Sequence, residues 1–226
     1  MTSEEAGSRW AWTHVAVGAV AVVGVCLGYF LSPSLVVAPD LTVDLAAARA
    51  AALTDTGFMR LAGVLGVLGD PVIAVGAFAL AVEARADARA ALGFWWLGAC
   101  ALLFTVVDAM TGFALRSAAD AGGFPFVKPL FDGLILSSSF SYGVSAILLG
   151  WPARGNALAP RGLTLALFAT GVVLAGASVA AALGIGGLGA LVGIGITATT
   201  LLYLPIAVLH VLARRPAAAL RPALAR

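Results

Sequence analysis

Two acidic side chains lie within stretches that are otherwise apolar enough to cross a membrane. Asp70 stands beside Pro71 in the segment from Gly63 to Gly76, and Asp108 stands in the next apolar segment. An Asp at the centre of a spanning helix costs about 2.5 to 3.5 kcal/mol on insertion scales, so such residues normally face protein or trapped water. Both acids are therefore candidates to bind a proton, a cation or the polar group of a small substrate.

The two acids are expected to meet inside the protein. With a rise of about 1.5 Å per residue, Asp70 lies about 15 Å and Asp108 about 10 Å from the outer ends of their helices. Asp70 shares a helical face with Gly63 and Gly66, which turns it toward the closely packed side of its helix. Because the two helices are adjacent and antiparallel, their carboxyl groups could share one cavity.

Hydroxyl groups on neighbouring helices are expected at the same depth, where they would form a polar layer in the outer half of the bundle. They are Thr105, Thr111, Ser138, Ser141, Tyr142, Thr197 and Thr200. Pro71 and Pro205 each lack a backbone N–H and free the carbonyl four residues back. These two prolines are therefore candidate positions at which a helix breaks or flexes.

Two interpretations of this layer remain open. In the first, Asp70 and Asp108 bind a ligand or a proton, and the prolines mark places that move during transport. In the second, both acids are neutral, accept hydrogen bonds from hydroxyl groups, and serve only to fix the register of the helices. No basic residue is expected beside them inside the spans, so charge does not decide between the two.

The sequence gives little support to other chemistry. His14 and His210 lie near the cytoplasmic ends of the first and last spans, where interfacial imidazoles are favoured over haem ligands. There is no zinc motif, and no Ser is matched with a buried His or Lys at its depth. Cys26 and Cys100 are interpreted as buried apolar thiols. We therefore expect no enzyme activity, no metal and no cofactor.

The elements that position these residues are membrane-spanning helices. Of 226 residues 62% are hydrophobic and 11% charged, with a mean hydropathy of +1.05, whereas about a quarter of the residues are charged in a soluble domain. A spanning helix needs about 20 apolar residues and satisfies its own backbone groups. The sequence predicts an all-α, polytopic transmembrane bundle, with spans at 14–35, 60–82, 91–115, 130–151, 162–183 and 188–212.

Charge predicts the orientation of this bundle. With the N-terminal segment 1–13 and the basic tail 213–226 both in the cytoplasm, nine of the 13 Lys and Arg residues lie inside. The four outside are Arg49, Arg60, Arg116 and Lys128, the last in a predicted loop at 118–129. The first span is expected to be retained rather than cleaved, because its flank is not basic and its apolar core exceeds the 7 to 15 residues typical of a signal peptide.

The longest polar stretch runs from Pro39 to Met59 between the first two spans. Asp40 is placed to cap a short, Ala-rich helix there by accepting backbone N–H bonds. We expect this helix to lie on the membrane surface, with a lid on the outer side as the alternative.

Two segments carry a resemblance to a known group of proteins. They are Thr56-Gly-Phe-Met-Arg-Leu-Ala-Gly63 and Tyr142-Gly-Val-Ser-Ala-Ile-Leu-Leu-Gly-Trp151. In these segments the chain resembles uncharacterised six-span bacterial membrane proteins classed by a domain of unknown function, over about residues 12 to 212. The resemblance implies the fold and a bacterial inner (plasma) membrane, and it implies no catalytic residues.

The sequence thus predicts an integral membrane protein, with a small carrier, channel or proton-linked permease centred on Asp70 and Asp108 as its first candidate function. The alternative is an accessory or assembly protein that binds another membrane protein and whose buried acids are structural. The expected partners are the lipid bilayer and either a membrane protein or a second copy of the chain. Nucleic-acid binding is not expected, because most of the excess basic charge lies in the tail.

Overall fold

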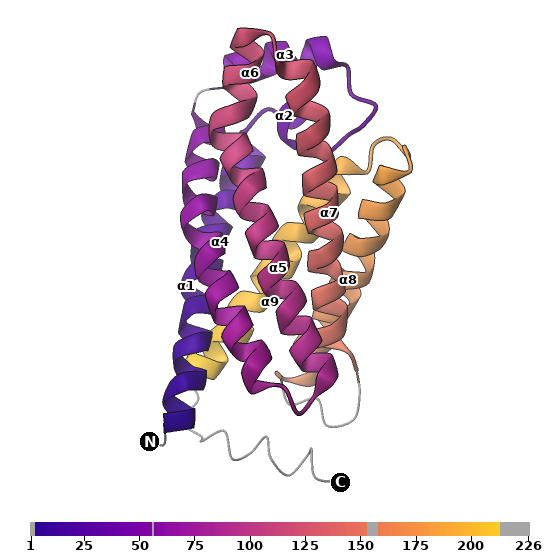
Figure 1. Cartoon of the computed structure of the whole chain (residues 1–226). Coiled ribbons are helices and arrows are strands. Elements are labelled where there is room, and N and C mark those ends of the chain that lie inside the picture. Colours follow the sequence, from indigo (N-terminus) through magenta and orange to yellow (C-terminus); the bar gives the residue numbers. More distant parts are fainter. Residues whose placement is uncertain (1–2, 56, 153–157, 213–226) are drawn as a thin grey trace.

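Six long helices form the body of the protein (Figure 1), and a computed structural model describes residues 3–55, 57–152 and 158–212. The six are α1 (Ser3–Leu31), α4 (Phe58–Glu83), α5 (Ala88–Ala109), α7 (Phe124–Gly150), α8 (Arg161–Ala182) and α9 (Gly189–Leu212). The third continues beyond α5 through a π-helical turn, η1 (Met110–Ala114), into α6 (Leu115–Ala121). The short helices α2 (Ser34–Val37) and α3 (Leu45–Thr54) lie between α1 and α4. The six-span, all-α bundle is confirmed, because all six long helices are apolar enough to cross a membrane.

The six helices form a closed ring in which α1 packs on α4, α4 on α5, α5 on α7, and α7 on α8. The last helix, α9, is tilted and closes the ring between α8 and α1 (Figure 1). It meets α1 where α1 begins and α9 ends, and there the ring of His210 stacks on Trp12 at 4.2 Å. We name this the terminal end and the opposite one the α3 end. Toward the α3 end α9 crosses away from α1, and it begins beside the carbonyl oxygen of Pro39.

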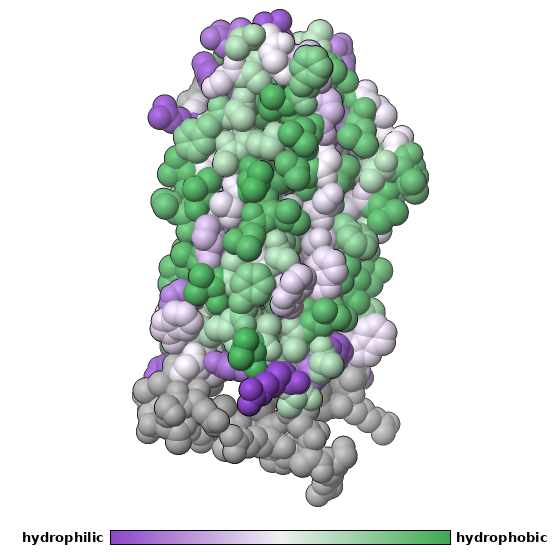
Figure 2. Space-filling model, viewed as in Figure 1, coloured by the Kyte–Doolittle hydropathy of each residue, from purple (hydrophilic) through white to green (hydrophobic). Residues whose placement is uncertain are grey.

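The outer surface of the bundle is suited to lipid. Apolar residues cover most of the face seen in Figure 2, and hydrophilic residues gather at its two ends. Large apolar side chains such as Leu68, Val82 and Leu102 point outward and are about half to two thirds exposed. An apolar surface of this extent around a bundle of spanning helices needs a hydrocarbon solvent. The chain is therefore an integral, multi-pass membrane protein.

The predicted outer loop at 118–129 is largely helical, which corrects one expectation. The third span continues to Ala121 and ends at Gly122, whose φ of +83° suits a residue without a Cβ. Helix α7 begins only two residues later, with Pro125 in its first turn. Lys128 lies inside α7 and is fully buried. Its expected place in an exposed loop is wrong.

The polar stretch between the first two spans also differs in detail. The first helix ends at Leu31, because Pro33 disfavours helical geometry at the residue before it. Asp44, not Asp40, caps α3 by accepting the backbone N–H groups of Ala46 and Ala47. Asp40 instead accepts bonds from the hydroxyl and the N–H of Thr42, which lower its pKa below the usual range. The expected cap at Asp40 is therefore wrong.

Helix α3 packs against α6 and α7 at the α3 end of the bundle. Its small residues Ala48 and Ala52 are fully buried in that contact, which keeps α3 close to the spanning helices. Residues 213–226, the predicted basic tail, lie outside the described residues.

Candidate functional site

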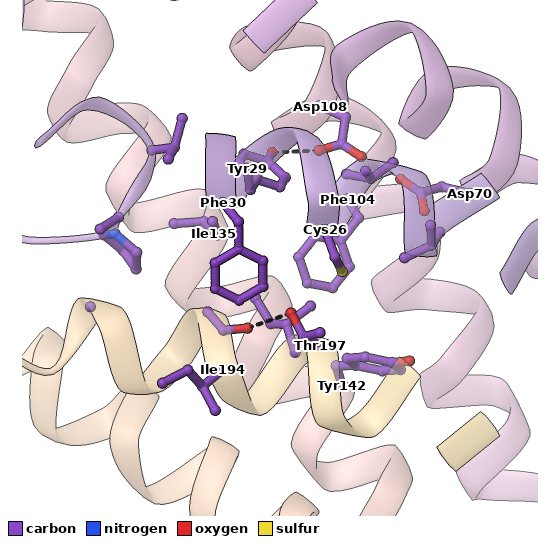
Figure 3. Close-up of a pocket in the computed structure, with 18 of the residues that line it drawn as sticks. Cys26, Tyr29, Phe30, Asp70, Phe104, Asp108, Ile135, Tyr142, Ile194 and Thr197 are labelled. Atoms are coloured by element: carbon purple, nitrogen blue, oxygen red, sulfur yellow. Dashed lines mark hydrogen bonds between the residues drawn. The ribbon is translucent and has the colours of Figure 1, made fainter. Parts of the chain in front are cut away.

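A cavity of about 250 Å³ lies among α1, α4, α5, α7 and α9 (Figure 3). Most of its wall is apolar, with side chains such as Val25, Ile73, Phe104 and Ile135. Toward the α3 end it is bounded by α2 and the residues that follow α2 up to Pro39. Both buried acids of the sequence pattern, Asp70 and Asp108, border this cavity.

Asp108 is held in place from two sides. Its Oδ1 accepts a hydrogen bond of 2.5 Å from the hydroxyl of Tyr29 on α1, and that hydroxyl lies 2.9 Å from Thr111 Oγ1. On α4, Gly66 leaves room for the Asp108 carboxyl, because a Cβ atom at Gly66 would overlap it. Asp108 is only 2% exposed. It therefore joins α1, α4 and α5 at one point.

Asp70 has a different environment, although it is the neighbour of Asp108. It lies on α4 one helical turn after Gly66, is 3% exposed, and its carboxyl is close enough to that of Asp108 for the two side chains to interact (Figure 3). Its Oδ2 is buried and has no hydrogen-bond partner among the described residues. Nearly all buried polar side-chain atoms have a partner, so an unpaired carboxyl oxygen beside a cavity calls for an explanation.

The π-helical turn η1 begins two residues after Asp108, at a place where α4 and the third span are in close contact. A Cβ atom at Gly63 would overlap the backbone of Gly112 in this turn. Thr111, also in the turn, is fully buried and donates to the carbonyl of Val107 at 3.0 Å. Single π turns inside helices are frequent at functional sites, and this one carries the hydroxyl that lies beside Tyr29.

The hydroxyl residues expected in the polar layer fall into two groups. Tyr142 and Thr197 line the cavity together with the two acids, and Thr200 lies 3.2 Å from the Tyr142 hydroxyl. Thr105, Ser138 and Ser141 do not line it, and their hydroxyls donate to carbonyls of their own helices, on Ala101, Leu134 and Ser137 respectively.

Tyrosines close the cavity toward the terminal end. The ring of Tyr142 on α7 stacks on that of Tyr203 on α9, with centroids 5.5 Å apart. The hydroxyl of Ser145 donates to the carbonyl of Gly93 on α5 and lies 2.9 Å from the Tyr203 hydroxyl. These contacts tie α5, α7 and α9 together beneath the cavity.

The two candidate break points lie in unbroken helices. Helix α4 continues through Pro71 to Glu83, and α9 continues through Pro205 to Leu212. In this conformation each proline therefore removes one hydrogen bond without ending its helix.

A third buried acid was missed by the sequence analysis because its partner was placed in a loop. Asp132 on α7 forms an ion pair with Lys128, one turn earlier, and the two residues are 1% and 0% exposed. Lys128 Nζ also donates to the carbonyl of Ala38 at 3.3 Å and lies 5.5 Å from the ring centre of Phe131. The spacing of four residues between base and acid was the available signal. This pair fixes the segment after α2, which borders the cavity.

Tyr29 was also missed, although it is the direct partner of Asp108. In the sequence it is one aromatic residue near the end of an apolar run, and nothing marks the face of α1 on which it lies. Its role follows only from the packing of α1 along α4.

The histidines lie away from this cavity. His210 Nε2 is 2.7 Å from the carbonyl of Leu158, and His14 Nδ1 is 2.9 Å from that of Trp10. Over residues 3–55, 57–152 and 158–212, no group of three or more His, Cys, Asp or Glu side chains is arranged to hold a metal ion.

Comparison of the chain with known proteins finds no relative. The chain matches no protein-family model, no curated protein and no solved structure. The residues of the cavity are therefore what bears on the function.

Proposed function

We propose that the protein is a small proton-linked carrier or permease of the membrane, with Asp70 and Asp108 as its proton-binding site. The observation that carries the proposal is the buried Oδ2 of Asp70, which has no partner among the described residues and belongs to a side chain bordering a cavity. A purely structural acid would be expected to have its oxygens satisfied, since an unpaired buried polar atom costs about 1–3 kcal/mol.

The two acids have different parts in this proposal. Asp108 is fixed by Tyr29 and by the close packing at Gly66, so it provides a stationary charge or hydrogen-bond partner. Two carboxylates side by side in a dry interior repel each other, so the pair is most stable when at least one of them holds a proton. Asp70 borders the cavity and has the open oxygen, and it is therefore the group that exchanges its proton.

The proposal includes the expected setting of a bacterial inner membrane, with the terminal end in the cytoplasm. Arg85 lies in the turn between α4 and α5 at that end, and Arg89 lies in the first turn of α5. Burial of Lys128 in an ion pair removes one of the four basic residues counted on the outer side, which increases the expected charge asymmetry.

One observation favours the alternative, an accessory or assembly protein with structural acids. The Tyr29–Asp108–Thr111 contacts join α1 to the third span and would stabilise the bundle without any transport. This alternative accounts for Asp108, but it leaves the unpaired oxygen of Asp70 without a purpose.

Infrared spectroscopy of the protein in reconstituted membranes tests the proton site. We expect the C=O stretching band of protonated carboxyl groups to lose intensity as pH rises, and Asp70→Asn to abolish most of this change. The matched control is Asp120→Asn, which makes the same chemical change at an exposed position on α6.

Transport is measured separately in liposomes with a trapped pH indicator. Asp70→Asn should stop proton movement coupled to solute uptake, and Asp120→Asn should leave it unchanged. If Asp70→Asn folds normally and keeps both the infrared change and the coupled proton movement, the proposed function is wrong.

A further inference from the structure

The cavity is a wedge that reaches the outer surface of the bundle between α1 and α9. Two of its wall residues, Phe30 on α1 and Ile194 on α9, are 61% and 54% exposed. The two helices meet at the terminal end, where Trp12 stacks on His210, and they separate toward the α3 end (Figure 1). In a membrane, this side of the bundle faces acyl chains. The wedge therefore offers a path from the lipid to Asp70.

Space for passage exists at the α9 side of the wedge. Gly193 lines the cavity, and a Cβ atom built on it would have no neighbouring atom within 4 Å. Glycines that serve only close packing behave differently here, since a Cβ atom at Gly63 or Gly66 would overlap the neighbouring helix. Gly193 therefore keeps a gap open instead of bringing two helices together.

The residues of the cavity wall limit the class of ligand that the cavity can bind. Among the described residues that line the cavity none is Lys, Arg or His, so an anionic ligand would meet two acids and no opposite charge. An inorganic cation such as Mg²⁺ or Ca²⁺ needs six or more oxygen ligands, and the wall is mainly hydrocarbon. The rings of Phe30, Phe104 and Tyr142 add faces that attract organic cations. The cavity is smaller than the pockets of drug-sized ligands.

The titratable groups that line the cavity with Asp70, among the described residues, come from three of the packed helices. Those lining the cavity are Cys26 and Tyr29 on α1, Asp108 and Cys100 on α5, and Tyr142 on α7. The described lining residues of α9 include none. All of these groups are neutral or negative, so no residue in the wall competes with a cationic ligand for Asp70.

We infer that the substrate is a small amphiphilic amine in its ammonium form, which enters from the lipid between α1 and α9 and donates a hydrogen bond to Asp70 Oδ2. This inference rests on the proposed function for its transport role, but binding can be measured without transport. The exchange is balanced: the ammonium keeps its protons, the carboxylic acid of the pair releases one proton to water, and the net charge of the site is unchanged. Uptake of the amine would thus be coupled to movement of a proton in the opposite direction.

The test uses 2-phenylethylammonium as the probe, with 2-phenylethanol as a neutral probe of similar size. Calorimetric titration of the protein in lipid nanodiscs, in two buffers of different ionisation enthalpy, gives affinity and proton release together. We expect the ammonium to bind with release of about one proton, because one carboxyl of the pair must ionise to receive it. The Asp70→Asn variant should bind it about 10- to 100-fold more weakly, without that release.

The access route has its own pair of variants. Gly193→Leu places a side chain into the open part of the wedge and should weaken or slow ammonium binding. Gly176→Leu is the matched control, because Gly176 on α8 also has no atom within 4 Å of an added Cβ and does not line the cavity. It should leave binding unchanged. Equal effects of the two variants would overturn the lateral route.

Two outcomes separate this inference from the proposed function. If the ammonium does not bind while the infrared experiment shows an Asp70-dependent proton site, the substrate class is wrong and the proton-linked function stands. If 2-phenylethanol binds as tightly as the ammonium and Asp70→Asn changes neither, the cavity is an apolar site for neutral molecules and the inference is overturned.

Discussion

Two acidic sites buried within the described spanning helices are built on opposite principles. Asp132 is matched by Lys128 on its own helix, and the lysine is further occupied by the carbonyl of Ala38 and the ring of Phe131. Asp70 is matched by another acid, Asp108, and one of its oxygens has no partner among the described residues. The first site has opposite charges in contact, and the second has like groups in contact beside a cavity.

The difference separates a structural acid from a candidate functional one. Burial is nearly the same for Asp132 and Asp70, at 1% and 3% exposure, so burial alone does not distinguish them. The partners do, because a further ligand adds little stabilisation to an acid that is already held in an ion pair. A ligand that donates to an unpaired carboxyl oxygen adds more. Removal of a partner should therefore have its largest effect on stability at the lysine site and its largest effect on binding at Asp70.

The contrast is tested most strongly by leaving Lys128 without its acid. Asp132→Leu should lower the free energy of unfolding by about 3–5 kcal/mol, because an unpaired ammonium group remains buried. The measurement is denaturation by SDS in mixed micelles. The double variant Lys128→Met with Asp132→Leu should recover most of the loss, since two apolar side chains then fill the site. A double variant as unstable as the single one would show that the pair is not the cause.

A smaller effect is expected where α4 touches Asp108. Gly66→Ala should destabilise the protein by about 1–3 kcal/mol, because the added Cβ overlaps the Asp108 carboxyl and forces the helices apart. Gly176→Ala is the control with open space, and it should be neutral or stabilising by up to about 1 kcal/mol. Both values come from the same SDS titration. Equal behaviour of the two glycines would contradict the close contact at Gly66.

Loss of the Tyr29 hydroxyl should lower the free energy of unfolding by a smaller amount. Tyr29→Phe keeps the ring and removes one hydrogen bond to Asp108, so we expect a loss of about 0.5–1.5 kcal/mol in the free energy of unfolding. The infrared band of the carboxyl pair should also shift, because Asp108 loses its donor. An unchanged band would indicate that the hydroxyl does not act on Asp108.

The smallest change in stability is expected at the group with the largest expected effect on binding. Asp70→Asn removes an ionisable group but no hydrogen bond at Oδ2, so the free energy of unfolding should change by less than about 1 kcal/mol. The same variant should lose the infrared change and the ammonium affinity. If it instead unfolds the protein as Asp132→Leu does, the two acidic sites are alike and the contrast between them fails.

Much of the scaffold could be predicted from the sequence, since each span is a long apolar run and Gly63, Gly66 and Asp70 repeat at helical spacing. The same reasoning placed Asp108 on the facing helix, and the structure brings the two carboxyl groups together. Lys128 could not be placed in this way, because the glycines and prolines around it are typical of a loop. Its burial depends on Asp132 and on the segment after α2, which are tertiary contacts.

The composition of the cavity wall was harder to predict for a related reason. Hydroxyl residues at one depth, such as Ser138 and Thr197, look equivalent in the sequence, but the rotation of each helix decides which of them faces inward. The hydroxyls of Ser138 and Thr197 both donate to carbonyls of their own helices, but only Thr197 lines the cavity. The tilt of α9, which opens the wedge at Gly193, has no local sequence signal.

The π turn at Met110–Ala114 changes the direction in which the side chains after it point, relative to those before it. Each residue of an α-helix turns the chain by about 100°, and the wider turn changes the phase of the residues beyond it. Before the turn Asp108 points at Gly66 of α4, and beyond it Leu115 and Ala119 pack in an apolar cluster with Val36 of α2 and Phe124 of α7. Deletion of a single residue from this turn would restore a regular helix. Either Asp108 or the pair Leu115 and Ala119 would then point away from its present contacts.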